Sequence, residues 1–480
     1  MREQFWNLLW GKRFDGGSDA TPVASTFGRF GRFCGFRQST PLARDRYVGG
    51  VAWNLPRGKR FDGCSDATPV ASTLGWLVRF RGFRQSTPLA RVRYGGGGAT
   101  LSCLRLWLVG LLMSPIAASA WIEPPAVTAK GYPVPAPNTV PEIPAAHGAH
   151  RAYAIEWWYW TGHLNVVGET DDRFGFQSTV FRIAGAPGAA SESSEATFGD
   201  RQLYMSHVGL SDFADGRYLH HERVYREGWQ ARVDVGALAL QVGPITATEL
   251  AAGDGFETTI RYEDGTRLEL LMRPAKPMVA FGERGLSRKG QDPAAVSWYW
   301  TYTRLNVTGQ LVRGTDVLAV EGVAWMDHEI SSSQLGSDLA GWDWTAIHLD
   351  DGTEVKAYRL RQTDGGSDPW SAVYWIDAVG NTESIYADQF TWEEVSEWTS
   401  PATGLTYPTT VRITARHPAT GETKIYVLVP QMDAQEFVGN NGSNAYWEGA
   451  CEVQDAAGRV IGRAYLELAG YGGGLSGQLN

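Results

Sequence analysis

Cysteine is scarce in this chain of 480 residues, which contains only four cysteines. Three of them lie at positions 34, 64 and 103, and the fourth is Cys451. The larger part of the chain therefore has neither a disulfide framework nor a C-x-x-C zinc site, and its stability must come from packing. Familiar catalytic signatures are also missing, namely the G-x-S-x-G elbow, the H-E-x-x-H zinc motif and the phosphate-binding P-loop.

Basic residues are in the minority, because 43 Lys and Arg stand against 52 Asp and Glu, which gives a net charge of −9. We expect no nucleic-acid partner, since a phosphate footprint needs a basic surface. Long helical periodicity is nearly absent. The chain instead has 20 Trp, 19 Tyr, 18 Phe and 57 Gly, in short apolar runs separated by turns such as 263–265 and 350–352. This pattern predicts an all-β barrel or sandwich.

The first hundred residues differ from the rest in charge, with 16 Lys and Arg against 6 Asp and Glu. Within them, residues 11–47 recur at 58–94 with 30 of 37 positions identical. The repeat has no sustained helix or strand period, so we expect a non-globular, disordered region. We favour a segment translated upstream of the true start over a basic tail that binds nucleic acid or membrane. A basic repeat without the apolar pattern of a folded core does not by itself indicate a specific binding function.

Residues 101–120 resemble a secretory signal. Arg105 precedes an apolar run from Leu106 to Met113, and Ala118-Ser119-Ala120 provides an A-x-A cleavage site. The run is too short for a transmembrane helix, which needs about 20 apolar residues. We therefore expect a periplasmic or secreted protein that begins near Trp121. Residues 121–150 contain seven prolines and predict an extended tether.

An internal echo suggests two β domains. The sequence WYWT occurs at 158–161 and again at 298–301, and LNV follows at 164–166 and 305–307. We interpret the echo as two related domains, 151–294 and 295–475. Each is long enough for an eight-stranded barrel that encloses a small ligand.

Aromatic and acidic residues alternate in three strand-like clusters. In the first, Glu156 shares a strand face with Trp158, while Tyr159 lies on the other face and His163 follows. A carboxylate between indoles would be desolvated, which raises its pKa, although an aromatic core strand whose Glu forms a hydrogen bond or salt bridge is the simpler interpretation of Glu156 alone.

The second cluster, residues 322–329, places Trp325, Asp327 and Glu329 on one face of a strand and His328 on the other. Two carboxylates beside an indole can serve as a general acid and its electrostatic partner, or they can be charges at a strand end. Because consecutive residues point to opposite faces, the Asp-His-Glu run does not converge on a metal, and we expect no metal and no cofactor. The remaining aromatic-acid candidates are Trp342, Trp344, His207 and Trp447.

These motifs together resemble the AttH-like and carotenoid 1,2-hydratase (CrtC) family. The matching segments, in chain order, are EWWYWTGHL (156–164), MSHVGLSDF (205–213), GLSRKG (285–290), SWYWT (297–301), VEGVAWMDHE (320–329), GWDW (341–344), TYP (406–408), YWEG (446–449) and YLELAGY (465–471). The resemblance implies an all-β fold of two tandem lipocalin-like β-barrels after the non-globular N-terminal region.

The family includes hydratases, secreted hydrolases and partners of exporter systems, so the resemblance implies several functions. One is hydration of a double bond in an apolar isoprenoid or lipid, which needs an acid that stays protonated and aromatic faces that stabilise a carbocation. The alternatives are a noncatalytic periplasmic carrier beside a membrane exporter, and a secreted hydrolase. The residues expected to act in catalysis are Asp327 as the acid, with Glu329, Glu156 and His163. Those expected to contact the ligand are Trp158, Tyr159, His207, Trp325, Trp342, Trp344 and Trp447.

Overall fold

The computed structural model describes residues 121–187, 202–251, 253–440 and 444–473. Within these ranges the chain forms β-strands and two short 3-10 turns, η1 (Ala145–His147) and η2 (Ala387–Gln389), and it has no α-helix. The all-β prediction is therefore confirmed. The expected duplicated segment and signal lie outside the described residues. Both sheets belong to one compact unit that includes residues 119–480.

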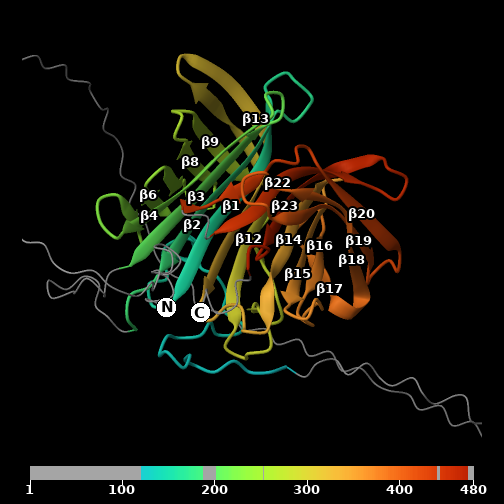
Figure 1. The fold of residues 1–480 in the computed structure, drawn as a ribbon. Helices are drawn as coiled ribbons and strands as arrows, with labels where there is room; N and C mark the ends of the chain where they lie inside the picture. The colour runs from blue at the N-terminus through green and yellow to red at the C-terminus, as the bar shows by residue number, and fades with distance from the viewer. Residues whose placement is uncertain (1–120, 188–201, 252, 441–443, 474–480) are drawn as a thin grey trace, which may run out of the picture. The chain divides into compact units, whose positions relative to one another are not determined.

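The first sheet is antiparallel and curls into a barrel-like shape (Figure 1). Its strand order is β4-β3-β2-β1-β13-β12-β9-β8-β7-β6-β5, with β10 and β11 also paired to β12. The bounds are β1 Ile155–Val166, β2 Phe174–Ile183, β3 Leu203–Asp212, β4 Arg217–Arg226, β5 Ala231–Val233, β6 Ala239–Val242, β7 Ile245–Glu249, β8 Phe256–Arg261, β9 Arg267–Pro274, β10 Val279–Ala280, β11 Ser287–Arg288, β12 Val296–Arg313 and β13 Asp316–Ser331.

The second sheet has the order β17-β16-β15-β14-β23-β22-β20-β19-β18, with β21 paired to β22. It forms a second barrel-like body, coloured orange to red in Figure 1. Its bounds are β14 Leu339–Leu349, β15 Glu354–Gln362, β16 Ala372–Ile376, β17 Thr382–Tyr386, β18 Phe390–Thr399, β19 Thr406–Arg416, β20 Thr423–Pro430, β21 Glu436–Val438, β22 Ala445–Gln454 and β23 Val460–Ala469. We call the two bodies barrel 1 and barrel 2.

The change of sheet lies at residues 332–338, whereas the sequence placed the boundary at 294/295. Strands β12 and β13 pair with β9 and β1, so they complete barrel 1. The two WYWT copies do not begin two domains; they flank β13 on its two edges, with Trp158 and Trp300 both opposite His328. Two strands that pack on the same neighbour need similar side chains, and this explains the echo without a domain repeat.

The proline-rich segment 121–150 lies against barrel 1 and is not a free tether. Tyr132, Val134 and His147 are buried, and Val134 joins a cluster with Trp298 and Ile330. Proline content correctly indicates the lack of regular structure, but it does not show where the apolar side chains of the segment find partners.

Apolar side chains form separate cores inside the two barrels and a third core between them. The core of barrel 1 includes Trp158 and Trp160, and that of barrel 2 includes Trp447. The third core mixes Tyr159 and Trp325 from barrel 1 with Trp344 and others from barrel 2. The two barrels are therefore packed on each other through an aromatic layer, and this layer contains the site.

Two histidines join the barrels in a reciprocal way. His163 Nε2 of barrel 1 lies 2.9 Å from the carbonyl oxygen of Ala464, and His348 Nε2 of barrel 2 lies 2.8 Å from that of Thr303. Ion pairs between the barrels accompany both contacts, Asp172 with Arg463 and Glu354 with Arg304. The matching sequences WTGHL (160–164) and WTAIHL (344–349) carry the two histidines, so they mark the repeated element.

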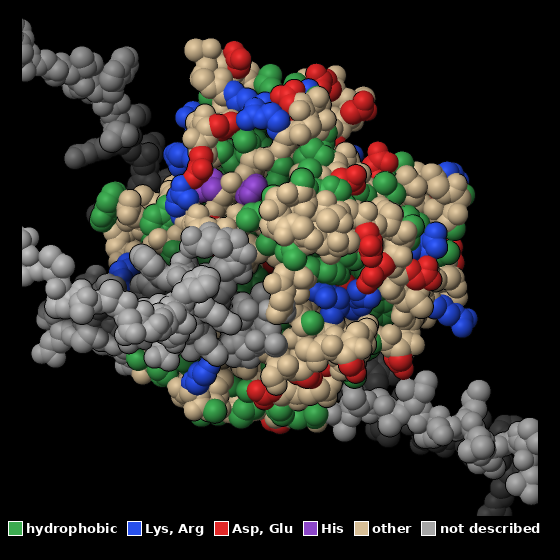
Figure 2. Space-filling model, viewed as in Figure 1, with side chains coloured by type: hydrophobic (Ala, Val, Ile, Leu, Met, Phe, Trp, Pro, Cys, Tyr) green, Lys and Arg blue, Asp and Glu red, His purple; other side chains and the backbone are tan. Residues whose placement is uncertain are grey.

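Surface charges are interspersed in sign on the part of the face that Figure 2 leaves uncovered. None of the helices in the described residues is long and apolar enough to cross a membrane.

Candidate functional site

A cavity of about 230 Å³ lies between the barrels. Barrel 1 contributes residues of β1, β2, β3, β4, β12 and β13, and barrel 2 contributes residues of β14, β15, β22 and β23. Six of the predicted residues line it: Tyr159, His207, Asp327, Glu329, Trp342 and Trp344. No Ser or Cys lines it among the described residues, so a serine or cysteine nucleophile is lacking there.

Asp327 is buried and accepts three hydrogen bonds. Tyr299 donates to Oδ2 at 2.6 Å, and the Thr301 hydroxyl and Trp325 indole donate to Oδ1 at 2.6 and 2.7 Å. Burial raises the pKa of Asp327 to about 6, although nearby Lys356 and these donors oppose the shift. A carboxyl with this pKa holds a proton in part of the molecules near neutral pH.

Lys356 approaches Asp327 from strand β15 of barrel 2. It is fully buried, and its Nζ lies 3.2 Å from the ring centroid of Tyr299 and 4.0 Å from that of Phe281. Burial lowers the pKa of Lys356 well below its ordinary value, while the charge of Asp327 raises it. Aromatic faces compensate part of the desolvation of its ammonium group.

Glu329, two residues further along β13, is already paired. Lys289 Nζ lies 2.7 Å from its Oε2, and Ser297 donates to the same oxygen. These two contacts fix the carboxylate in place, so Glu329 is suited to an electrostatic role beside Asp327.

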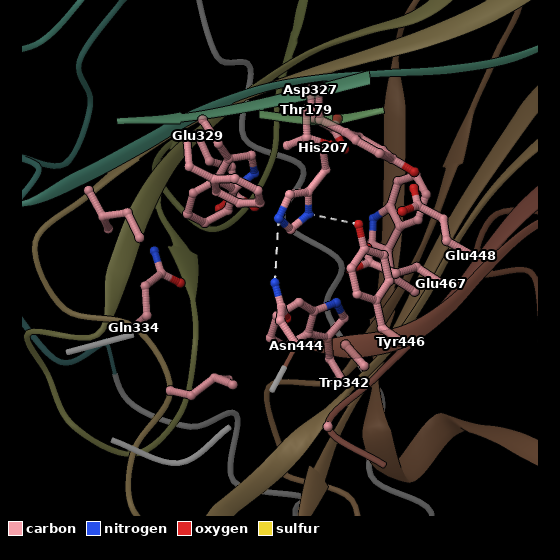
Figure 3. Close-up of a pocket in the computed structure, with 18 of the residues that line it drawn as sticks. Thr179, His207, Asp327, Glu329, Gln334, Trp342, Asn444, Tyr446, Glu448 and Glu467 are labelled. Atoms are coloured by element: carbon pink, nitrogen blue, oxygen red, sulfur yellow. Dashed lines mark hydrogen bonds between the residues drawn. The ribbon is translucent and has the colours of Figure 1, made fainter. Parts of the chain in front are cut away.

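His207 connects the barrels at the other side of the cavity (Figure 3). Its Nδ1 lies 2.9 Å from the hydroxyl oxygen of Tyr446, and its Nε2 lies 3.1 Å from Glu222 Oε2. Asn444 also contacts both His207 and Glu222. His207 thus orients Tyr446, and Glu222 orients His207.

Glu448 and Glu467 form the acidic wall of barrel 2. They lie directly opposite each other on β22 and β23, and both line the cavity (Figure 3). Glu467 keeps some exposed surface, which faces this cavity. Burial raises the pKa of Glu467 to about 7, helped by the charges of Asp327 and Glu329 and opposed by a hydrogen bond with Trp342. Burial and the charge of Glu467 raise the pKa of Glu448 well above its ordinary value.

Glu156 was expected to be catalytic, but it points away from the cavity into barrel 1. Its Oε2 accepts from Arg182 Nε at 2.7 Å, and its Oε1 lies 2.8 Å from His150 Nδ1 and 2.9 Å from His328 Nε2. Arg182 and the two histidines hold the pKa of Glu156 well below its ordinary value despite burial, which leaves it a fixed anion.

His150, Glu156 and His328 lie close enough together to hold a metal ion, with ligand atoms within 4.8 Å of one another. The set differs from the Asp-His-Glu run considered in the sequence, because His328 faces away from Asp327. Arg182 already occupies one Glu156 oxygen, and its positive charge disfavours a cation there. We interpret this group as a structural network of buried hydrogen bonds.

Four other predicted residues do not line the cavity. Trp158 stacks on His328 inside barrel 1, Trp447 lies in the core of barrel 2, and His163 joins the barrels. Trp325 is buried behind Asp327 and positions that carboxyl. Their neighbours line the cavity instead, namely Trp157 and Tyr159 on β1, and Tyr446 and Glu448 on β22.

Sequence reasoning missed Glu222, Glu448, Glu467, Tyr446 and Tyr299. Tyr446 and Glu448 share a face because they are two residues apart, and the motif YWEG already contained this signal. Glu467 stands in YLELAGY in the same way. Only the pairing of the strands shows that these faces turn toward the cavity and not toward the core of barrel 2.

The chain is similar to known proteins over most of the described residues. A model of the AttH-like family matches residues 134–471. A crystal structure at 2.00 Å of a protein assigned as an AttH from Nitrosomonas europaea has 32% identity and a TM-score of 0.61, and the match covers 70% of this chain and 99% of that one.

Kievitone hydratase from Nectria haematococca has 12% identity and a TM-score of 0.51, with 72% of this chain and 97% of that chain covered, so it shares the fold. No curated protein sequence matches significantly. The family match and the 32% identical structure agree with the motifs found in the sequence. The chain belongs to the AttH-like family.

Proposed function

We propose that the protein binds an apolar isoprenoid or lipid in the cavity between its barrels and hydrates a carbon–carbon double bond by acid catalysis. The observation that carries the proposal is Asp327, a buried carboxyl with a pKa of about 6 that lines an aromatic cavity. Such an acid is protonated in a useful fraction of molecules near neutral pH.

The reaction begins with proton transfer from Asp327 to the less substituted carbon of the double bond. The π electrons form the new C–H bond, and a tertiary carbocation remains on the neighbouring carbon. Water then donates a lone pair to the cation and loses one proton to the Asp327 carboxylate, which restores the acid. Alkene and water thus become a tertiary alcohol with no net gain or loss of protons.

Aromatic side chains can stabilise the cation without trapping it. Tyr159, Trp342 and Trp344 line the cavity, and each face over a cation contributes about 0.5–2 kcal/mol. Tyr299 lies between Asp327 and Trp344. The Trp344 indole donates to the Tyr299 hydroxyl at 3.0 Å, and this hydroxyl donates to Asp327 and keeps that carboxyl in place.

Export belongs to the same proposal, because the signal-like segment 101–120 precedes the described fold. The partner expected in this case is an apolar small molecule, with a membrane exporter as a further partner if the protein delivers its ligand.

The test is hydration in D₂O with citronellol and squalene, a short and a long isoprenoid with trisubstituted double bonds. We expect a tertiary alcohol with one carbon-bound deuterium for each hydroxyl gained. Organic extraction of the purified protein, followed by mass spectrometry, identifies any ligand that co-purifies. If a ligand binds but stays unconverted in D₂O, the result would contradict the hydratase proposal and favour a noncatalytic carrier.

A further inference from the structure

The barrel 2 wall of the cavity contains two acidic side chains that the hydration proposed above does not use. Glu448 and Glu467 are cross-strand partners in the antiparallel pair of β22 and β23. Directly opposite residues place their Cβ atoms about 4.5–5.5 Å apart on one face of a sheet. Two carboxyls are therefore held side by side at the edge of an apolar space.

This pair has no counter-charge. Neither Glu448 nor Glu467 forms an ion pair with any described residue, and the nearby cation Lys289 is held by Glu329 at 2.7 Å. Glu448 is only 1% exposed, yet its Oε1 has no hydrogen-bond partner in the described part of the chain. The hydroxyls of Tyr159 and Tyr446 interact with the Glu448 carboxyl and oppose the rise in its pKa, but they add no positive charge. A buried polar atom left unpaired is expensive, so Glu448 Oε1 is suited to a ligand that completes it.

Aromatic faces surround the pair. Tyr159, Trp342, Trp344 and Tyr446 all line the same cavity. An aromatic wall next to an unpaired carboxylate attracts organic cations, because ring faces and carboxylates are both negative and an alkylated cation loses little hydration on entry.

We propose that the Glu448–Glu467 pair makes this cavity selective for apolar ligands that carry one positive charge, such as a protonated amine or a quaternary ammonium group. The inference shares the cavity with the proposed function and does not depend on catalysis. A cationic ligand supplies the counter-charge that the protein lacks, and its apolar body contacts the aromatic walls.

Proton release accompanies binding. Because burial and the charges of neighbouring carboxylates raise both pKa values, the pair keeps a proton near neutral pH, and a bound cation expels it. Ammonium affinity should therefore rise with pH. The other titratable groups around the pair are Tyr159, Tyr218, Tyr446, Tyr465, His207, Asp327 and Glu329. Burial raises the pKa of the four tyrosines, which remain neutral, whereas Asp327 titrates in the same range.

The experiment compares benzyltrimethylammonium with neopentylbenzene, its neutral carbon isostere, by calorimetry and tryptophan fluorescence. We expect the ammonium to bind about 10- to 30-fold more tightly at about pH 8, and this preference to shrink toward about pH 5. Calorimetry in buffers of different ionisation enthalpy should show protons released with the ammonium and none with the isostere. Equal affinities, or no ammonium binding to the folded protein, would overturn the proposal.

Variants test whether the Glu448–Glu467 pair itself, and not the rest of the cavity, causes the preference for ammonium. Glu448→Gln and Glu467→Gln should each lose the preference for ammonium, while Glu452→Gln, on the same strand but outside the cavity, should keep it. If the unaltered protein prefers the ammonium while hydration is never seen, only the proposed function fails; if hydration occurs without a preference for the cation, only this inference fails.

Discussion

Asp327 and Glu156 are both buried carboxyls, but their surroundings give them opposite protonation states. Glu156 faces a guanidinium at 2.7 Å and two histidines, which favour the anion. Asp327 has neutral donors from Tyr299, Thr301 and Trp325, and the cation beside it, Lys356, is itself desolvated. Burial therefore dominates at Asp327, while the ion pair dominates at Glu156.

The Asp327→Asn variant tests the acid. An amide cannot donate a carboxyl proton, so we expect turnover of citronellol or squalene in D₂O to fall about 10²–10⁴-fold with the ligand still bound. Turnover by the unaltered protein should also decline as pH rises above about 6, since the carboxyl then loses its proton. Asp350→Asn, at a turn outside the cavity, is the control. Unchanged turnover in Asp327→Asn would remove this residue from the proposed role.

Glu156→Gln tests the structural role of the buried network around Glu156. Removing one partner of a buried ion pair leaves Arg182 uncompensated, so we expect a loss of about 3–5 kcal/mol in the free energy of unfolding. The control Glu227→Gln breaks a partly exposed pair with Arg151 and should cost less than about 1 kcal/mol. Urea unfolding at neutral pH measures both, and equal effects would contradict a structural role for Glu156.

Glu467→Gln should make the protein more stable at alkaline pH. The pKa of Glu467 rises from 4.5 to about 7 on folding, so its contribution to stability is full below about pH 4.5 and is lost as pH rises through about 7. Glutamine cannot ionise, and the variant should gain of the order of 1–3 kcal/mol at about pH 8 and little at about pH 4. Urea unfolding at the two pH values measures this, and a variant less stable at alkaline pH would show that the carboxylate is compensated.

Residue positions explain how far the sequence could predict the site. The alternation of side chains correctly grouped Trp325 with Asp327 and Glu329, and Glu156 with Trp158. The alternation of side chains along a strand shows which residues share a face, but it does not show whether that face turns to a core or to a cavity. For β13 the expected face lines the cavity, whereas Glu156, Trp158 and Trp447 lie on core faces. That choice depends on how one barrel packs on the other, which local sequence does not encode.

At the scale of elements, the sequence predicted strands and two barrels but misassigned the long pair β12 and β13. The WYWT echo is real, yet its two copies flank β13 within barrel 1. The shorter likeness of WTGHL to WTAIHL marks corresponding strands, because each places a histidine against the backbone of the other barrel. A motif repeated within one sheet and a motif repeated between sheets look alike until the pairing is known.

The reciprocal histidines lead to a prediction about coupling. In His163→Leu and His348→Leu, a buried carbonyl of the opposite barrel loses its donor, so each variant should lose about 1–3 kcal/mol. The double variant should unfold in two calorimetric transitions, one for each barrel, where the unaltered protein shows one. His417→Leu, a partly exposed histidine of barrel 2, is the control. A single transition in the double variant would assign the coupling to the aromatic layer alone.

At the scale of the whole molecule, the first described residue, Trp121, is also the residue that follows the proposed cleavage site. Trp121 packs beside the cluster of Val134 and Trp298, and the guanidinium groups of Arg284 and Arg288 lie 4.5 and 5.4 Å from its ring centroid. A chain that begins at Trp121 therefore keeps its first residue anchored on barrel 1. Cleavage after Ala120, if the proposal holds, would remove the basic repeat and three of the four cysteines and leave the buried Cys451.

Expression of the full chain in a bacterial host with a secretion pathway tests this. We expect the periplasmic protein to have the intact mass of residues 121–480, and its unfolding midpoint to be unaffected by reductant, because one cysteine cannot form an internal disulfide. A version that starts at Trp121 should unfold with the same free energy, within about 0.5 kcal/mol. An exported form that retains residues 11–94 would show that the duplicated segment belongs to the working protein, and the basic tail would then need a partner of its own.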